Sequence, residues 1–277
     1  MKLFKTKNCI IIQKDNTYYP VNENWDLFVN DDHLFDKMDK ITNENDPINN
    51  GQELIDAGLE APIGSQELWA SGVTYMRSKV GRQEESQKTG GGDYYQRVYE
   101  AERPELFFKA NANRIVGHGE KVRIRQDSTW DVPEPELTLL ITSNEKIVGY
   151  TVGNDMSSRS IEGENPLYLP QAKTYDACAA LGPCIFVTKD PLPSNTPIDL
   201  KIKRAGKIVY EGNVEINQIK RTFKELVSFL YRECTFPCGS MLMTGTGIVP
   251  TSEFTLQSGD EISITIDKIG TLVNEVE

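Results

Sequence analysis

Two classes of cysteine site are missing from this sequence. Its 277 residues include five cysteines, yet no Cys-x-x-Cys pair occurs, and no set of histidines and cysteines with zinc spacing follows Cys234 or Cys238. A structural zinc site is therefore not expected. Because the number of cysteines is odd, we predict free thiols in a reducing compartment rather than a disulfide framework.

The sequence also has no long apolar run and no excess of basic residues. No stretch approaches the length of a membrane-spanning helix, and the apolar run over residues 9–12 is too short for a signal peptide. Lys and Arg total 30 against 41 Asp and Glu, which gives a net charge of −11. Nucleic acid requires a basic surface, so neither nucleic acid nor a membrane is an expected partner, and the expected location is the cytoplasm.

The chain does contain enough apolar sequence for a large buried core. Hydrophobic residues make up 38% of its positions, as in folded globular proteins. No internal repeat, low-complexity tract or alternating strand–helix unit occurs, and strand-like segments outnumber helix-like ones. We therefore predict an α+β fold rich in antiparallel or mixed β-structure. A small α/β domain is expected over residues 1–62, followed by a larger domain over residues 63–277.

Apolar periodicity and turn residues predict the individual elements. In the first domain we expect a strand pair within residues 2–19, one or two helices within 24–40 and a short helix over 52–57. Residues 76–89 have a charged, helical pattern before three glycines at 90–92, which predicts either a lid over 76–102 or an ordinary surface excursion. Further helices are expected over 93–101 and 219–231. Strands are expected over 105–109, 122–125, 137–141, 147–152, 181–187, 198–202, 207–210 and, as the last of the chain, 262–266. A short strand that ends on a glycine is expected within 69–75, a strand then a turn within 115–120, and a strand that runs into a Gly-rich turn within 242–247.

One short stretch concentrates negative charge. Pro133, Glu134, Pro135 and Glu136 follow one another, and the prolines exclude a helix and favour extended geometry. In an extended chain, residues two apart point to the same face, so the two glutamates project together. Their repulsion is relieved by a cation, a shared proton or open water. The stretch is therefore either part of a site for a hard divalent cation or an acidic edge strand in water.

A third carboxylate follows at the end of the next predicted strand. Residues 144–146 have the composition of a hairpin turn, and the returning strand ends at Gly153, Asn154 and Asp155. If the two strands are antiparallel neighbours, the hairpin brings Asp155 within reach of Glu134 and Glu136.

With the segments around them, these residues resemble the fumarylacetoacetate hydrolase superfamily. The resemblance covers about residues 65–277 and implies a mixed β-roll fold of the fumarylacetoacetase C-terminal-domain type. It also implies a divalent metal, usually Mg²⁺, with Mn²⁺ or Ca²⁺ as alternatives, and assigns Glu134, Glu136 and Asp155 as its ligands. The implied substrates are 2-oxo acids, which bind the metal through the carboxylate and the 2-oxo oxygen. The matching segments lie at 108–109, 116–119, 133–137, 149–151, 154–159, 173, 181–183 and 244–246.

Two further segments are similar to a narrower branch, the 2-keto-3-deoxy-pentonate dehydratases. They are RPELFFK at 103–109 and ENPLYLPQAK at 164–173. Hydrolase branches carry a histidine on a lid soon after the segment that matches residues 71–75, and this histidine activates water. Here residues 76–85 contain no histidine, and the only two, His33 and His118, lie elsewhere. The resemblance therefore implies elimination of water rather than hydrolysis.

The implied reaction converts 2-keto-3-deoxy-D-arabinonate or -xylonate to 2,5-dioxopentanoate and water, in the catabolism of pentose-derived sugar acids. Removal of a C3 proton and departure of the C4 hydroxyl require a positioned base and acid. Lys173 is the first candidate for this work, because the pKa of a lysine near a metal and other cations can be lowered. Glu105 is the second candidate, as an acid or in orienting water.

Five more residues are expected to contact the substrate or support the site. Lys109 and Arg159 either hold carboxylate or hydroxyl oxygens of the substrate or pair with the glutamates. Ser71, Gly72 and Thr246 are candidate substrate contacts because of their places in the family pattern.

Three alternatives stay open. Two are enzymes of the same family: a C–C hydrolase of the acylpyruvate or fumarylacetoacetate type, and a 2-oxo acid decarboxylase. The third, from another class, is a non-catalytic module that binds a metal or a carboxylate; retention of the proposed ligands and Lys173 argues against it. The resemblance also implies a homo-oligomer, either a dimer or a tetramer. The expected binding partner is the substrate, a small 2-keto acid.

Overall fold

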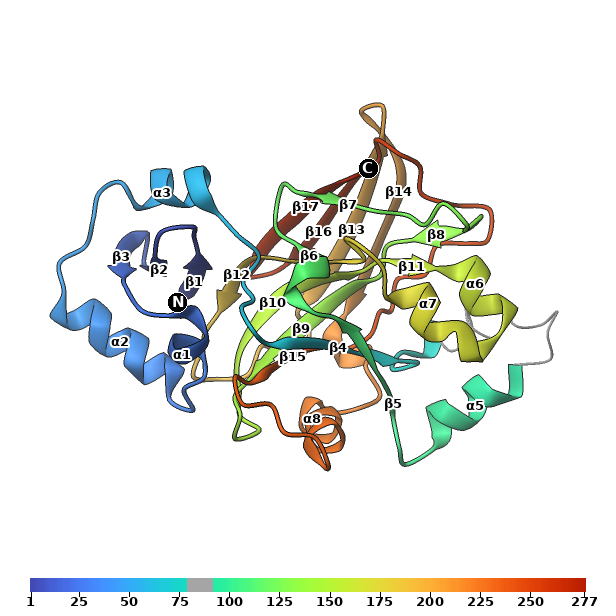
Figure 1. Ribbon diagram of the computed structural model, residues 1–277, viewed down its shortest axis with the longest axis horizontal. Helices are drawn as coiled ribbons and strands as arrows, with labels where there is room; N and C mark the ends of the chain where they lie inside the picture. The colour runs from blue at the N-terminus through green and yellow to red at the C-terminus, as the bar shows by residue number, and fades with distance from the viewer. Residues whose placement is uncertain (79–91) are drawn as a thin grey trace.

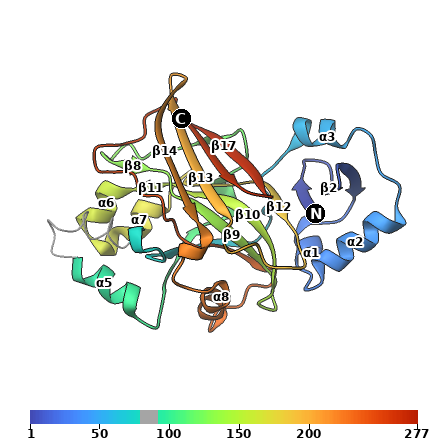
Figure 2. The ribbon, with the colours of Figure 1, turned by 180° about the vertical axis from the view of Figure 1, so that it is seen from behind.

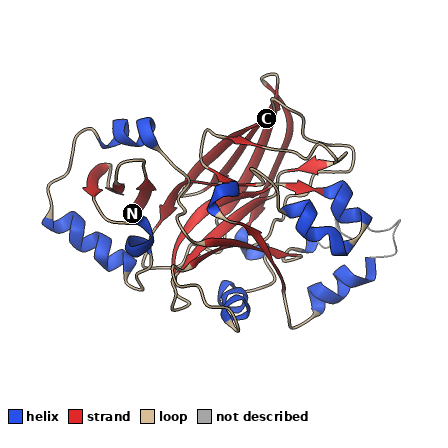
Figure 3. Cartoon of the chain, viewed as in Figure 1, coloured by secondary structure: helices blue, strands red, loops and turns tan. Residues whose placement is uncertain are grey.

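The computed structural model describes residues 1–78 and 92–277, without the side chains of residues 92–95. Within these ranges strands form the body of the molecule and helices lie around them (Figure 1 and Figure 3). The strands belong to two main sheets and one short pair. The prediction of a strand-rich, mixed α+β fold is therefore confirmed.

The larger sheet has ten strands, both parallel and antiparallel. They are β1 (Lys2–Lys5), β2 (Ile10–Lys14), β3 (Thr17–Val21), β4 (Glu67–Gly72), β5 (Glu105–Ala110), β6 (Ile115–Val116), β9 (Pro135–Ile141), β10 (Ile147–Asp155), β12 (Ala179–Phe186) and β15 (Ser240–Met243). The order is β3-β2-β1-β12-β10-β9-β15-β4-β5, and β6 pairs with β12. Every residue of β9 and most of β10 are buried, as in strands that are covered on both faces.

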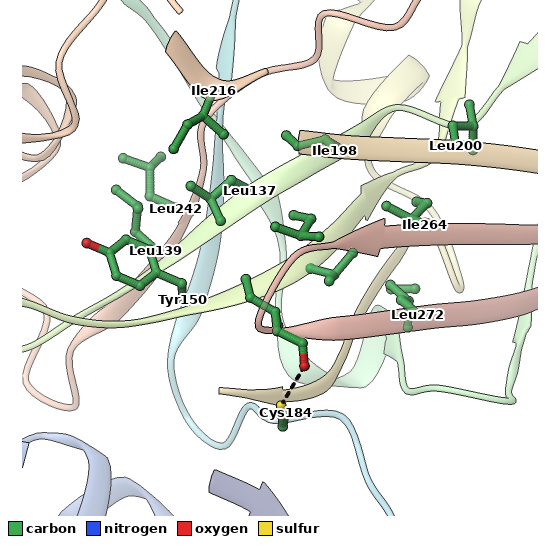
Figure 4. Close-up of a cluster of buried hydrophobic side chains, with 14 of the residues drawn as sticks. Leu137, Leu139, Tyr150, Cys184, Ile198, Leu200, Ile216, Leu242, Ile264 and Leu272 are labelled. Atoms are coloured by element: carbon green, nitrogen blue, oxygen red, sulfur yellow. Dashed lines mark hydrogen bonds between the residues drawn. The ribbon is translucent and has the colours of Figure 1, made fainter. Parts of the chain in front are cut away.

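A second sheet packs across one face of the first. It contains β7 (Lys121–Val122), β13 (Pro197–Arg204), β14 (Lys207–Glu215), β16 (Glu261–Ile266) and β17 (Gly270–Val276), in the order β14-β13-β16-β17-β7. Seen from behind, β13, β14 and β17 lie over the central strands of the large sheet (Figure 2). Leu137 and Leu139 of β9 belong to one buried apolar cluster with Ile198 of β13 and Ile264 of β16 (Figure 4). This apolar layer holds the hairpin of β9 and β10 in place.

The first sixty residues form a unit of three strands and three helices. The helices are α1 (Trp25–Val29), α2 (Leu34–Glu44) and α3 (Gly51–Gly58), and the Asn24 side chain caps α1 by accepting a hydrogen bond from the Leu27 N–H. Strand β1 pairs antiparallel with β12, with Leu3 opposite Ile185, so the three strands continue the large sheet. A domain boundary at residue 62 stays a prediction.

The remaining short elements lie near the two ends of β10. The strand pair β8 (Asp131–Val132) and β11 (Ser157–Ser158) and the helices α6 (Arg159–Glu164) and α7 (Leu169–Lys173) lie near its end at Asp155, whereas α8 (Phe223–Tyr231) lies near its start. Helix α5 (Gly92–Glu100) precedes β5. Helix α6 follows β11 directly, and α7 follows α6 after a single 3-10 turn (Figure 1). Pro170 stands in the first turn of α7, where its missing N–H costs no hydrogen bond.

Several predicted bounds were wrong. The first domain has three strands rather than two, because residues 10–21 fold into a hairpin of their own. The predicted strand over 122–125 ends at Val122, since only Lys121 and Val122 find partners on β17. By contrast, within 242–247 the prediction of a strand that runs into a Gly-rich turn is confirmed, since β15 ends at Met243 and Gly245 takes a φ of +94°.

Two further corrections concern the second half of the chain. The helix predicted over 219–231 begins only at Phe223, because Thr222 has extended geometry and its side chain caps the helix at the Glu225 N–H. The strand over 262–266 is not the last, since β17 follows it and pairs with it in register. Of the lid predicted over 76–102, residues 79–91 lie outside the described residues.

Candidate metal and active site

The hairpin of β9 and β10 brings three carboxylates together. Glu136 lies opposite Gly153, and the pairing continues one step beyond β9, where the Asp155 N–H donates to the Glu134 carbonyl at 2.9 Å. Carboxylate oxygens of Glu134, Glu136 and Asp155 all lie within 4.8 Å of one another. The extended geometry predicted from the prolines, and the approach of Asp155, are both confirmed.

These carboxylates are buried rather than open to water. Their exposed fractions are 4% for Glu134, 1% for Glu136 and 1% for Asp155, so the alternative of an acidic edge strand in water is wrong. Burial, followed by the negative charges of Asp155 and Glu134, raises the pKa of Glu136 well above its ordinary value. The Gly245 N–H, 2.5 Å from Glu136 Oε2, acts in the opposite direction. Additional positive charge would therefore stabilise this cluster.

Three cationic side chains from three different elements surround the cluster. Lys173 at the end of α7 places its Nζ 2.5 Å from Glu134 Oε2 and 3.1 Å from Asp155 Oδ2. Arg159 at the start of α6 places Nη2 2.5 Å from Glu134 Oε1. Lys109 on β5 places its Nζ 2.6 Å from Asp155 Oδ1. All three cations are at least 98% buried, so their charges act over short distances with little screening.

Lys109 is held by three groups of the protein itself. Its ammonium forms an ion pair with Asp155 and donates hydrogen bonds to the carbonyl of Met156 at 2.9 Å and to the carbonyl of Lys173. Lys109 thus joins the strand end that carries Asp155 to the helix that carries Lys173.

A small cavity opens directly onto the cluster. Eight of the ten residues proposed from the sequence line it, and the other two, Glu105 and Lys109, lie beside it on β5. The Glu105 carboxylate rests on Gly72, where a Cβ atom would lie 2.0 Å from Glu105 Oε2. The structure therefore gathers all ten predicted residues in one place. The lining residues are Ser71, Gly72, Val73, Ser78, Phe107, Glu134, Glu136, Asp155, Arg159, Lys173 and Thr246.

Some residues of the site were not predicted. The Phe107 ring lies 5.6 Å from Lys173 Nζ, and the Ser157 hydroxyl accepts a hydrogen bond from that Nζ at 2.6 Å. Phe107 could have been predicted from the sequence, because it lies two residues from both Glu105 and Lys109 and therefore shares a face of the strand with them. Val73 has a φ of +53°, a strained conformation for a β-branched residue, and no sequence signal indicates it.

Neither of the two histidines belongs to the site. His33 is exposed at the residue before α2. His118 lies in a turn, where its Nδ1 accepts a hydrogen bond from the Val273 N–H at 3.2 Å. Hence no histidine of this chain stands beside the carboxylates to activate water, as was expected from the sequence. In the described ranges, no helix combines the length and the apolar character needed to cross a membrane.

The sequence is similar to a known family and to known dehydratases. The family model described as fumarylacetoacetate hydrolase, C-terminal, matches residues 75–277. A Haloferax volcanii protein named "Probable 2-keto-3-deoxyxylonate dehydratase" is 48% identical over 223 residues, which are 80% of this chain and 76% of that protein. The 2-dehydro-3-deoxy-D-arabinonate dehydratase of Saccharolobus solfataricus is 45% identical over 228 residues, covering 81% of this chain and 76% of its own.

Solved structures show the same relationship along the entire chain. A structure of 2-keto-3-deoxy-D-arabinonate dehydratase complexed with magnesium and 2,5-dioxopentanoate superposes with a TM-score of 0.83 at 37% identity, covering 100% of this chain and 99% of that one. The apo form of 2-keto-3-deoxy-D-arabinonate dehydratase gives a TM-score of 0.84, with the same coverage. The N-terminal unit, which the family model does not match, is thus included in the structural likeness.

Proposed function

The chain belongs to the fumarylacetoacetate hydrolase family, and from this premise we propose that it is a Mg²⁺-dependent dehydratase of 2-keto-3-deoxy pentonates. The reaction converts 2-keto-3-deoxy-D-arabinonate or 2-keto-3-deoxy-D-xylonate to 2,5-dioxopentanoate and water. The observation that carries this proposal is the identity of 48% and 45% to two proteins named as dehydratases of these acids, each over about four fifths of the chain. The absence of a histidine in the site agrees with it.

The residues of the site fit a hard divalent cation. Such ions take carboxylate oxygens, and Glu134, Glu136 and Asp155 offer three that lie within 4.8 Å of one another. Burial, and then the charges of Asp155 and Glu134, raise the pKa of Glu136, and this supports a cation at this position. We assign these three residues as the ligands of Mg²⁺, with Mn²⁺ or Ca²⁺ as substitutes. When bound, the ion supplies a Lewis acid for the 2-oxo acid group of the substrate.

Proton transfer is assigned to two residues. The elimination takes a proton from C3 and returns one to the departing C4 hydroxyl, so that one molecule of water leaves and a C3=C4 double bond forms. Tautomerisation then moves a proton from C5 to C3 and the C5 hydroxyl proton to C4, which gives the C5 aldehyde of 2,5-dioxopentanoate with no net proton consumed. Lys173 is proposed for this work because its Nζ lies in the cavity between Glu134 and Asp155. Glu105 is proposed as its partner, because its carboxylate lies against Gly72, a residue that lines the same cavity.

The remaining residues of the site are proposed to bind the substrate or to hold other side chains in position. Among the described residues, the Ser71 hydroxyl is buried and has no hydrogen-bond partner, so it is suited to a substrate oxygen. Arg159 and Thr246 line the same cavity, and Gly72 keeps its floor free of a side chain. For Lys109, whose ammonium contacts Asp155 and two backbone carbonyls, we propose the second of the two predicted roles, that of holding Asp155 and the end of α7.

Turnover of a panel of acids tests the proposal. The purified protein is incubated with 2-keto-3-deoxy-D-arabinonate, its xylonate counterpart, an acylpyruvate and oxaloacetate, each with Mg²⁺ or with EDTA. We expect 2,5-dioxopentanoate from the first two acids only, and no product with EDTA. Cleavage of the acylpyruvate without dehydration would favour the C–C hydrolase, carbon dioxide release would favour the decarboxylase, and no turnover of any acid would favour the binding module.

A ligand substitution tests the metal assignment. Glu134→Gln keeps the shape of the side chain but removes its charge, and we expect turnover to fall at least about 100-fold. Binding of Mn²⁺, measured by calorimetry without substrate, should weaken in parallel. Glu211→Gln, on the exposed part of β14, is the control and should change neither quantity. Near-normal Mn²⁺ binding by the Glu134→Gln variant would remove Glu134 from the ligand set.

The quaternary structure and location are part of the same proposal. We expect a homo-oligomer, a dimer or a tetramer, that works in the cytoplasm on a small 2-keto acid. Size-exclusion chromatography with light scattering measures the number of subunits, and a monomer at micromolar concentration would contradict the first statement.

A further inference from the structure

Lys173 has a hydroxyl partner to which no role has been assigned. The Nζ of Lys173 lies 2.6 Å from Ser157 Oγ, closer than its 3.1 Å to Asp155 Oδ2. We propose that Ser157 is a positioning residue that fixes the Lys173 ammonium at the cavity; this inference rests on the proposed function of the site.

The direction of the hydrogen bonds defines what Ser157 does. A hydroxyl has one hydrogen, and Ser157 donates its hydrogen to the backbone carbonyl of Asp155 at 3.1 Å. In its contact with Lys173, Ser157 is therefore the acceptor. Since Ser157 belongs to β11 and is fully buried, its oxygen is held by the backbone that carries Asp155. The position of Nζ is thus tied to that of a proposed metal ligand.

Ser157 differs from the two carboxylates that also contact Lys173. Glu134 and Asp155 are proposed ligands of the metal, so a bound cation competes with Lys173 for their oxygens. The Ser157 hydroxyl is neutral and lies outside the ligand set, so its hydrogen bond to Nζ does not depend on the occupancy of that set. A lysine has a flexible four-carbon stem, and an anchor of this kind restricts where its end can lie.

The next residue provides a matched control. Ser158 is also fully buried on β11, but its hydroxyl donates to Ser128 Oγ at 2.8 Å and accepts from the Ile161 N–H at 3.4 Å, which caps α6. It does not contact Lys173. Replacing either serine removes one buried hydroxyl, and only the Ser157 change removes the anchor of Nζ.

The experiment compares Ser157→Ala and Ser157→Cys with Ser158→Ala. A hydrogen bond to a charged group corresponds to about a 10- to 100-fold effect, so both Ser157 variants should lose about that factor in kcat. KM for the 2-keto acid and the Kd for Mn²⁺ should stay within about 3-fold, because Ser157 touches neither. Ser158→Ala should retain kcat within about 3-fold, even if its unfolding temperature falls. The thiol of the Cys variant preserves the volume but accepts hydrogen bonds poorly, which covers the case in which the Ala variant does not fold.

A second measurement does not depend on turnover. In protein labelled with ¹⁵N-lysine, the ammonium signal of Lys173, identified by its loss in Lys173→Met, should shift and exchange faster in the Ser157 variants but not in Ser158→Ala. Unchanged kcat with an unchanged signal would overturn the proposal, as would an equal loss of kcat in all three variants. If the unmodified protein dehydrates no 2-keto-3-deoxy acid, the proposed function fails, and the lysine signal alone then decides the role of Ser157.

Discussion

The charged residues of the site support one another pair by pair. Glu134 is contacted by Lys173 and Arg159, and Asp155 by Lys109 and Lys173, all of them buried. A buried ion pair is costly to break, because the partner left behind keeps its charge without solvent. Substitutions in the cluster are therefore expected to change the stability of the protein as well as its chemistry, and the two effects must be measured separately.

Lys109 allows this stability effect to be measured. Lys109→Met preserves the length of the side chain but removes one of the two cations on Asp155 and leaves two backbone carbonyls without the Lys109 donor. We expect the free energy of unfolding to fall by about 3–5 kcal/mol, measured by urea denaturation. Lys207→Met, on the exposed end of β14, should change it by less than about 0.5 kcal/mol. A Lys109→Met variant as stable as the wild type would show that these contacts do not hold the site together.

The buried carboxyl of Asp131 should make the stability of the protein depend on pH. Its side chain is 3% exposed, and burial raises the pKa of its carboxyl to about 6, above the ordinary 3.8. Between these two values the folded chain keeps a proton that the unfolded chain has released, so the contribution of Asp131 to stability falls as pH rises through this window. Asp131→Asn should therefore stabilise the protein by about 1 kcal/mol at pH 7, after allowance for screening, and have little effect below about pH 4. Urea denaturation at both pH values measures this, and a destabilised variant at pH 7 would contradict it.

At the scale of the elements, the turn after β15 has little room for a side chain at Gly245. Gly245 has a φ of +94° and donates its N–H to Glu136, and a Cβ atom at this position would lie only 2.0 Å from Thr74 Oγ1. Gly259 has a similar φ of +84°, but nothing lies within 4 Å of its Cβ position. The two glycines thus share a backbone conformation and differ in their surroundings.

Alanine substitutions at Gly245 and Gly259 separate the cost of the backbone conformation from the cost of a steric clash. Gly259→Ala should cost about 1–2 kcal/mol in the free energy of unfolding, because alanine disfavours the left-handed conformation by that amount. Gly245→Ala should cost more, because the turn must also move away from Thr74, and turnover should fall because the N–H on Glu136 moves with it. Thermal unfolding and initial rates measure both effects. Equal losses of stability with full activity in both variants would show that the turn does not position Glu136.

For the molecule as a whole, the N-terminal unit shares an apolar cluster with the rest of the chain. Leu3, Ile12 and Phe28 belong to the same buried cluster as Leu140 and Met241, which lie on the large sheet. Strand β12 also pairs with β1. The fragment 63–277 would expose this surface and a free strand edge, so we expect it to aggregate or to melt at least about 10 °C below the full chain.

The fragment experiment also tests the boundary predicted at residue 62. Light scattering and thermal unfolding of fragment 63–277 are compared with those of the full chain. A soluble fragment that melts cooperatively at the temperature of the full chain would show that residues 63–277 fold independently. The expected outcome would instead make residues 1–62 an integral part of the fold.

Short segments of the sequence determined a large part of the carboxylate site. The alternation of prolines and glutamates dictates an extended segment with both carboxylates on one face, because proline excludes a helix and strands have a period of two. The hairpin turn at residues 144–146 then returns the chain to bring Asp155 alongside, and the missing histidine depends on composition alone. These features were predictable because each is decided within about twenty residues.

Only the tertiary structure decided how distant residues combine. The meeting of Lys109, Arg159 and Lys173 at the carboxylates depends on three separate elements, and the anchoring of Lys173 by Ser157 depends on the direction of a single hydroxyl. The strained φ of Val73 and the pairing of β17 have the same origin. Such features arise from packing between segments far apart in the chain, and no local pattern of residue types specifies them.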